Sequence, residues 1–344
     1  MKRVKLLDCT LRDGGYVNGW RFSDEQISFT VSNLVEAGLD FIEVGFLTSI
    51  LQSVGGSQFR TVQDASRLLS RDKSNSKYLM MADVSMFDTD TLCGRDEGLI
   101  DGIRVVFYKR QIEQAVDFCA KIVEKGYDLF LQPMVTVDYS AKEYEALIRR
   151  FCKLYSPFAV SIVDSFGSMR SNEVVMFANI LDGCLDKQIR IGFHGHDNMQ
   201  MSQINAMALL EGGYDRELML DASVNGMGRG AGNLRTELIA NFLNISYGSG
   251  YVLDGIFRVM GEVTLPIAKE NPWGYSPYFL LTALKKAHPN FATYLLEKHD
   301  IGIDDFKSYL ELIPDEMLTK CTRPYVEELH MQFERNRPQS RRSA

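Results

Sequence analysis

Eight short apolar segments recur along the first 245 residues of this chain, with amphipathic stretches between most of them. Each segment has the length of a buried strand and carries few charges before its carboxyl end. Several amphipathic stretches begin with Ser or Asp and end on Gly, as helices commonly do. The apolar segments are VKLLDCT, FIEVGF, KYLMMADVS, IDGIRVVFY, YDLFLQPMVTV, FAVSIVDSF, IRIGFHGH and LMLDASVNG. This alternation predicts repeated βα units around a parallel sheet.

Eight βα units in about 245 residues predict a TIM (β/α)8 barrel. A doubly wound sheet is the competing fold, but its usual GxGxxG turn after the first strand is absent here. The remaining sequence has a helical pattern, with NPWGYSPY as a loop and LLTALKKAHPNFATYLLEK as the clearest helix. We therefore expect an α/β protein with a TIM-barrel catalytic domain over residues 1–245, a small C-terminal helical domain over 246–334 and a disordered basic tail over 335–344.

The composition argues against several classes of partner. The formal net charge is −7, whereas nucleic acids and anionic membranes favour a basic surface. The six cysteines are scattered without a CxxC pair, so neither a zinc knuckle nor a dense disulfide framework is expected. The apolar run in MKRVKLLDCTLRD is too short for a signal peptide or a membrane span. We expect a cytoplasmic protein.

Polar residues gather at the carboxyl ends of the predicted strands. Catalytic residues of TIM barrels lie at this end of the strands, so the pattern places an active site at one rim. Glu43, within the second strand, is a candidate for binding substrate. The polar residues at the predicted rim are Asp8, Arg12, Asp13, Gln132, Asp164, Ser165, His194, His196, Asp197, Asn225, Arg229 and Asn233.

The HGH motif indicates a metal site. Side chains two residues apart on a strand point to the same side, so His194 and His196 both face the barrel mouth. Asp13 follows the neighbouring first strand and can complete three protein ligands. This ligand set suits Mg, Mn, Zn or Fe(II). The alternative is that the histidines only form hydrogen bonds in the core.

Arg12 and the glycine-rich stretch GMGRGAGN each allow two interpretations. Arg12 is either the salt-bridge partner of Asp13 or a group that stabilises the developing oxyanion of an anionic substrate. The amides of GMGRGAGN either receive a carboxylate or phosphate or simply form a tight turn.

Five motifs together resemble those of a known superfamily. DCTLRDG, IEVGF, VDSFG, GFHGHDN and DASVNGMGRGAGNLRTE occur in the order found in the DRE-TIM metallolyases, the HMG-CoA lyase-like superfamily. The sequence is most similar to the pyruvate aldolases of the 4-hydroxy-2-oxovalerate aldolase type. The motifs span residues 8–237, essentially the whole predicted barrel. The resemblance implies a divalent ion, usually Mn or Mg, held by Asp13, His194 and His196, with Asn233 as a further ligand.

The resemblance also implies roles for residues that bind substrate. Arg12 matches the arginine that stabilises the enolate oxygen, and Ser165 matches a serine that binds the pyruvate carboxylate. GYSPYFLLTA is similar to the region that supplies a tyrosine to the aldolase site; Tyr275 and Tyr278 both fit, and Tyr275 is the predicted substrate-binding residue.

Tyr16 is a departure from the aldolase pattern. It stands four residues after Arg12, where the aldolases have an acid/base histidine. The unperturbed pKa of tyrosine is about 10, far from neutral. Tyr16 either transfers a proton, as a catalytic residue beside Arg12, or only lines the pocket. Asp197 also stands where typical aldolases have histidine, and here the chain matches the lyase branch.

The expected reaction is cleavage or formation of a 4-hydroxy-2-oxo acid by a metal-dependent aldolase, through a pyruvate enolate. Its small-molecule partners would be a 2-oxo acid and an aldehyde. The resemblance also implies assembly as a homo-oligomer or with an aldehyde dehydrogenase, whereas the net charge argues against nucleic acid or membrane as a partner.

Two other functions are alternatives. A Claisen-type lyase or synthase would act on an acyl-CoA, but only Lys109 and Arg110 offer charge for the CoA. A catalytically idle barrel would serve as an assembly partner. The intact Arg12, Asp13, His194 and His196 argue against an idle barrel.

Overall fold

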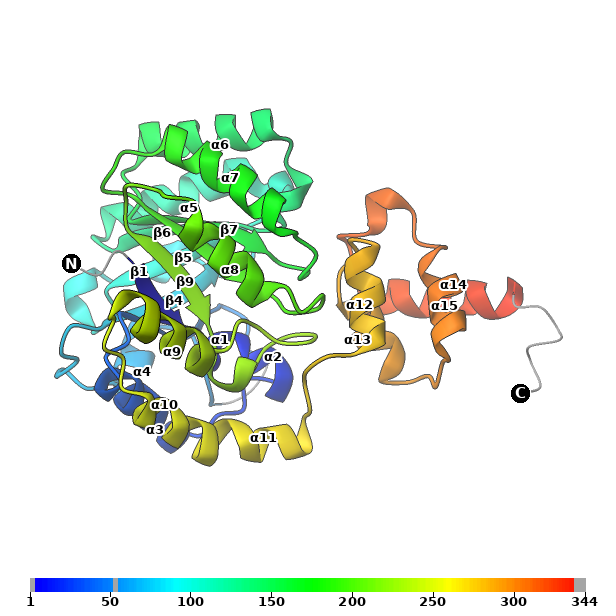
Figure 1. The fold of residues 1–344 in the computed structure, drawn as a ribbon, viewed down its shortest axis with the longest axis horizontal. Coiled ribbons are helices and arrows are strands. Elements are labelled where there is room, and N and C mark those ends of the chain that lie inside the picture. Colours follow the sequence, from blue (N-terminus) through cyan, green and yellow to red (C-terminus); the bar gives the residue numbers. More distant parts are fainter. Residues whose placement is uncertain (1–3, 52–54, 337–344) are drawn as a thin grey trace.

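The computed structural model describes residues 4–51 and 55–336, which contain a closed barrel of eight parallel strands (Figure 1). β1 pairs with β2 on one side and with β9 on the other, and this closes the sheet. Each strand coincides with one of the apolar segments above, so the predicted TIM barrel is confirmed. The barrel strands are β1 (Val4–Asp8), β2 (Phe41–Leu47), β4 (Lys77–Asp83), β5 (Gly102–Phe107), β6 (Asp128–Pro133), β7 (Ala159–Asp164), β8 (Arg190–Gly195) and β9 (Leu218–Ala222); β3 (Gln58–Phe59) adds a short pairing beside β2.

Helices follow most strands and cover the outside of the barrel (Figure 1). Capping boxes that begin at Ser23 and Ser140 fix the starts of α3 and α6. The connection after β4 contains only 3-10 turns at Thr89–Thr91 and Arg95–Glu97. The helices of the barrel are α1 (Thr10–Asp13), α2 (Gly15–Asn18), α3 (Asp24–Glu36), α4 (Val62–Ser66), α5 (Ile112–Glu124), α6 (Ala141–Leu154), α7 (Ser171–Cys184), α8 (Ser202–Glu211) and α9 (Thr236–Tyr247).

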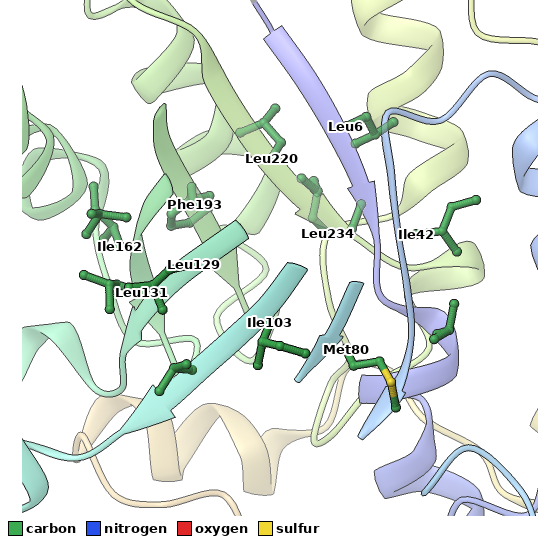
Figure 2. Packing of buried hydrophobic residues seen from close by; sticks show 14 of the residues in the cluster. Leu6, Ile42, Met80, Ile103, Leu129, Leu131, Ile162, Phe193, Leu220 and Leu234 are labelled. Carbon is green, nitrogen blue, oxygen red and sulfur yellow. The ribbon is translucent and has the colours of Figure 1, made fainter. Parts of the chain in front are cut away.

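Side chains alternate between the outside and the inside of the barrel along each strand. Figure 2 shows residues of the outward set, such as Leu6 and Phe193, which belong to the large cluster that joins strands to helices. The inward set forms a separate apolar cluster that contains Leu7, Phe41 and Met219. This interior cluster provides a packed floor beneath the polar residues of the rim.

The helices after the barrel belong to two different hydrophobic clusters. Ile256, Val259 and Val263 are part of the barrel cluster, because α10 packs against α3. α12 to α15 instead surround a cluster of their own, which includes Phe291 and Phe306. These helices are α10 (Leu253–Val259), α11 (Leu265–Glu270), α12 (Pro277–Leu284), α13 (Asn290–Leu296), α14 (Ile303–Leu310) and α15 (Arg323–Asn336), with a π-helical turn over Met260–Thr264. Ile267 and Trp273 still pack against the barrel cluster, so the two clusters separate between Trp273 and Tyr278. The domain bounds at residues 245 and 246 remain a prediction.

The prediction of one continuous helix over LLTALKKAHPNFATYLLEK was wrong. The segment is divided into α12 and α13, with a turn over residues 285–289 between them. Pro289 has no amide hydrogen and disfavours helical backbone at the residue before it. Lys286 adopts a left-handed conformation with φ of 55°. The break places His288 in a buried turn rather than on a helix face.

The first two residues of the predicted basic tail, Arg335 and Asn336, are the last residues of α15, and the rest of the tail, 337–344, lies outside the described residues. Within the described ranges, no helix is both long and apolar enough to cross a membrane.

Gly45 in β2 provides a test of the close packing beside the barrel mouth. A Cβ atom at Gly45 would lie 2.2 Å from the Ser57 carbonyl oxygen, which is backbone and cannot move aside easily. We expect Gly45→Ala to lower the free energy of unfolding by about 1–3 kcal/mol. Gly183→Ala in α7 meets no atom within 4 Å and should raise it by about 0.5–1 kcal/mol. Urea unfolding of both variants checks this, and destabilisation of similar size in both would contradict it.

Candidate active site and metal centre

The three predicted metal ligands meet inside the barrel mouth. Asp13 ends α1 directly after β1, His194 lies in β8 and His196 follows that strand. The Nε2 atoms of His194 and His196 lie 3.9 and 3.8 Å from Asp13 Oδ2. One donor atom from each residue lies within 4.8 Å of the other two. All three side chains are buried, so the structure brings the predicted set together around one point.

The residues around this point fit a divalent cation. Asp13 Oδ2 is buried and has no hydrogen-bond partner, and the same is true of Asn233 Oδ1. Carboxylate, amide and imidazole donors of this kind suit Mg, Mn, Zn or Fe(II). Burial lowers the pKa of His196 to about 3, so this imidazole is neutral at physiological pH, as a metal ligand must be. Burial opposes ionisation of Asp13, but the charge of Arg12 holds its pKa well below the usual value.

The charges in the barrel interior also favour a cation. The two buried guanidinium groups of Arg12 and Arg104 face the three buried carboxylates of Asp13, Glu43 and Asp221. Among these five side chains, two positive and three negative charges leave one negative charge in excess. A buried excess charge is costly unless a counter-charge is nearby.

A chain of ion pairs orients the groups on both sides of the centre. Arg12 Nε donates to Glu43 at 2.8 Å, and Arg12 Nη1 donates to Asp13 at 2.9 Å. Arg104 donates to Glu43 at 2.9 Å and also to Asp221. Asp221 in turn lies 3.1 Å from Nδ1 of His194, which leaves Nε2 of that ring directed at Asp13. Such a partner fixes the orientation of a ligating histidine.

Arg104 and Asp221 were not recognised from the sequence. Both lie within apolar segments: Arg104 is in the middle of IDGIRVVFY, and Asp221 is the one charge of LMLDASVNG. The signal that could have identified them is a charge at an inward position of a strand that is otherwise apolar, since such a charge requires a buried partner.

Arg12 retains one group for a ligand. Its Nη2 atom is buried and has no hydrogen-bond partner in the described chain, while Nε and Nη1 are held by Glu43 and Asp13. The sequence left open whether Arg12 is a salt-bridge partner or faces a substrate. The geometry provides both features, because two nitrogens are paired and the third is free to donate.

Ser165 also retains a donor. The backbone amide of Val135 donates to its hydroxyl oxygen at 2.9 Å, so the hydroxyl proton is available to another acceptor. Val135 has φ of 52°, a strained conformation for a β-branched residue. Strain of this kind often accompanies a functional site.

Three aspartates at the predicted rim hold the backbone instead of facing the centre. Asp8 accepts from the Thr10 amide at 2.9 Å. Asp164 accepts from the amides of Ser168 and Met169 at 2.8 and 3.0 Å. Asp197 accepts from the amide and hydroxyl of Ser202, at the start of α8. These carboxylates fix the loops that carry the site residues.

The GMGRGAGN stretch consists of tight turns. The amides of Gly226, Met227, Gly232 and Asn233 bond to carbonyls of the same region, and Ala231 donates to Asn198. Few amides of this stretch therefore remain for an anion.

The predicted tyrosines lie in different surroundings. Tyr16 is 39% exposed, and its ring lies beneath the Arg229 guanidinium at 4.6 Å. Desolvation raises the pKa of its hydroxyl, although the charges of Arg229 and Arg12 oppose that rise. Tyr275 is 61% exposed, and the Tyr278 hydroxyl donates to the Ile301 carbonyl at 2.6 Å. Among the described residues, no hydrogen bond or ring contact joins Tyr275 or Tyr278 to the metal-ligand cluster.

Comparison with known proteins gives consistent matches. A family model described as HMGL-like matches residues 105–254. A 4-hydroxy-2-oxovalerate aldolase from Chloroflexus aurantiacus is 30% identical over 283 residues, covering 79% of each chain. An oxaloacetate decarboxylase from Mycobacterium tuberculosis is 26% identical over 257 residues, covering 73% of this chain and 74% of that protein. The solved N-terminal domain of a putative aldolase from Bacteroides vulgatus has a TM-score of 0.71 at 25% identity, covering 86% of this chain and 97% of that one.

Substitutions at the centre should lower the affinity for Mn²⁺ in a graded order. Asp221→Asn replaces the carboxylate beside His194 Nδ1 with a neutral amide and should reduce the affinity for Mn²⁺ roughly 10- to 100-fold. Asp13→Asn removes the charged ligand itself and should reduce it further. Asp182→Asn, at a carboxylate paired with Arg216 at 2.7 Å, is the matched control and should leave affinity unchanged. Titration followed by electron paramagnetic resonance measures each affinity. Unaltered binding in Asp13→Asn would contradict the assignment.

Proposed function

This chain belongs to the HMGL-like family of the DRE-TIM metallolyases and is a carbon–carbon lyase, and we propose that it is a divalent-metal-dependent aldolase for 4-hydroxy-2-oxo acids. One observation carries this proposal: a buried Asp13–His194–His196 cluster lies beside an arginine with one uncommitted nitrogen. The names of the relatives support it. An aldolase for a 4-hydroxy-2-oxo acid and a decarboxylase for oxaloacetate both cleave the C3–C4 bond of a 2-oxo acid.

Different residues would bind the keto group and the carboxylate of the pyruvate half. A divalent ion held by Asp13, His194 and His196, with Asn233 Oδ1 beside them, would polarise the keto group and acidify the neighbouring carbon. Ser165 would donate its hydroxyl proton to the substrate carboxylate. Mn or Mg is the ion we propose.

Arg12 would stabilise the charge that develops during the reaction. In cleavage, the C3–C4 bond breaks, its electron pair stays on the pyruvate half as an enolate, and the C4 hydroxyl gives up its proton. Arg12 Nη2 can donate to the enolate oxygen without reorienting, because Glu43 and Asp13 already hold the guanidinium. A preorganised donor in a water-poor site contributes more than the same donor in water.

The acyl-CoA alternative receives less support from the geometry. Lys109 is paired with Glu143 at 2.8 Å, and Arg110 lies over the Tyr108 ring at 4.3 Å. These two surface charges are the only ones that the sequence offered for the phosphates of a CoA. An idle barrel would have no use for a buried excess of negative charge.

Exchange of the pyruvate methyl protons tests the proposal directly. In deuterated water with Mn²⁺, the wild-type protein should exchange these protons, and chelator should abolish the exchange. Arg12→Lys keeps a positive charge beside Glu43 but loses the third donor, so exchange should fall roughly 10²- to 10³-fold. Arg170→Lys, at an exposed position before α7, is the control. Proton NMR measures the rates, and absence of exchange from metal-loaded wild type would exclude this function.

Two substitutions at Tyr16 separate its two roles. The raised pKa and the Arg229 guanidinium above the ring support a pocket-lining role. Tyr16→Phe keeps the ring and should change kcat/KM for aldol cleavage by less than about 3-fold, whereas Tyr16→Ala should lower it about 10-fold. Coupled detection of pyruvate measures both. A large loss in Tyr16→Phe would instead establish proton transfer by the hydroxyl.

A further inference from the structure

A cavity of about 560 Å³ lies between the barrel and the C-terminal helices. Tyr16, Trp20 and Arg229 line it from the barrel, and Asn290 and Tyr294 line it from α13. Figure 1 shows α12 to α15 as a separate group of helices beside the barrel, and the cavity is lined from both. It offers room for the part of a substrate that extends away from the pyruvate half.

Arg229 in this cavity has no acidic partner within the described parts of the chain. Its guanidinium lies over the Tyr16 ring, and its Nε atom is buried without a hydrogen bond. Arg323, which lines the same cavity, is paired with Glu297. Unpaired arginines in partly buried positions are uncommon, because the desolvated charge is not compensated.

Arg229 is close to the metal centre. The preceding residue, Gly228, packs so tightly that an added Cβ would lie 3.0 Å from Asp13 Oδ2. The charge of Arg229 also contributes to the lowered pKa of Asp13. A substrate bound at the centre can therefore extend to this guanidinium.

His288 brings a second donor next to Arg229. It is only 6% exposed, and its Nε2 atom lies 3.4 Å from Arg229 Nη1. The Asn290 amide donates to Nδ1 at 3.1 Å, so the neutral ring carries its proton on Nε2. Burial and the charge of Arg229 lower the pKa of His288, which favours this neutral form. Two N–H groups thus face each other with no acceptor between them.

We propose that Arg229 and His288 form a subsite for a carboxylate on the aldehyde half of the substrate. Oxygen atoms of one carboxylate accept from both donors and form with the guanidinium the ion pair that no carboxylate of the described chain forms. The preferred substrates are then 4-hydroxy-2-oxo dicarboxylic acids, which cleave to pyruvate and an oxo acid. This inference rests on the proposed function for the reaction, but the subsite can be tested by binding alone.

Binding of two 2-oxo acids of equal length tests the subsite. 2-Oxoglutarate and 2-oxopentanoate differ only in the terminal carboxylate. We expect the wild-type protein with Mn²⁺ to bind 2-oxoglutarate roughly 10- to 100-fold more tightly, as charge-assisted hydrogen bonds would produce. Arg229→Gln should reduce this ratio to near one, and His288→Leu should reduce it in part. Arg323→Gln, at the paired arginine of the same cavity, should leave the ratio unchanged. Isothermal titration calorimetry gives each ratio.

Two kinds of result would overturn the subsite, one from binding and one from catalysis. One is equal affinity of the wild-type protein for the two acids, or an Arg229→Gln variant that binds both acids more weakly to the same degree. The other is an Arg229→Gln variant that condenses pyruvate with glyoxylate and with acetaldehyde more slowly by the same factor. Arg229 and His288 would then act on the C4 oxygen, which both products contain, and not on a terminal carboxylate. Failure of the aldolase assignment is recognised separately, by the absence of pyruvate methyl exchange in wild type while the binding ratio persists.

Discussion

A fully buried arginine, Arg104, organises the candidate active site. A charge inside a barrel must be matched by carboxylates within hydrogen-bond reach, and Glu43 and Asp221 meet this requirement. Glu43 also binds Arg12, and Asp221 also binds His194. Loss of one partner in such a network costs about 3–5 kcal/mol, so the orientation of the site depends on the same interactions as the interior of the fold.

The sequence could predict the centre because its ligands follow local rules. Alternation along β8 places His194 and His196 on the inner side, and the closed barrel brings β1 next to β9 and so near β8. The apolar segments and the capping serines likewise identified most strands and helices without knowledge of any contact. These features depend on residues close in sequence, or on the single assumption that the sheet closes.

What the sequence could not show depends on contacts between distant segments. Arg104 and Asp221 lie on β5 and β9, and their pairing appears only when both strands face the same interior. The turn at His288 lies in a segment with helical periodicity, in which only Pro289 indicated a break in the helix. Its contact with Arg229 also requires the position of the C-terminal helices relative to the barrel, which no periodicity encodes.

Under the proposed function, the arrangement would separate the chemistry of the pyruvate half from recognition of the other half of the substrate. Barrel strands and the loops directly after them hold the metal ligands, Arg12 and Ser165, where any shift would disturb the buried charges. Arg229 and His288 lie at the edge of that network, one on a loop and one on a turn between helices. Gly228 couples the two regions, because its close approach to Asp13 and Asn233 admits no side chain. If the proposed subsite binds the aldehyde half, a change in the turn at His288 would alter which aldehyde half is accepted, while the network around Arg104 would keep its geometry.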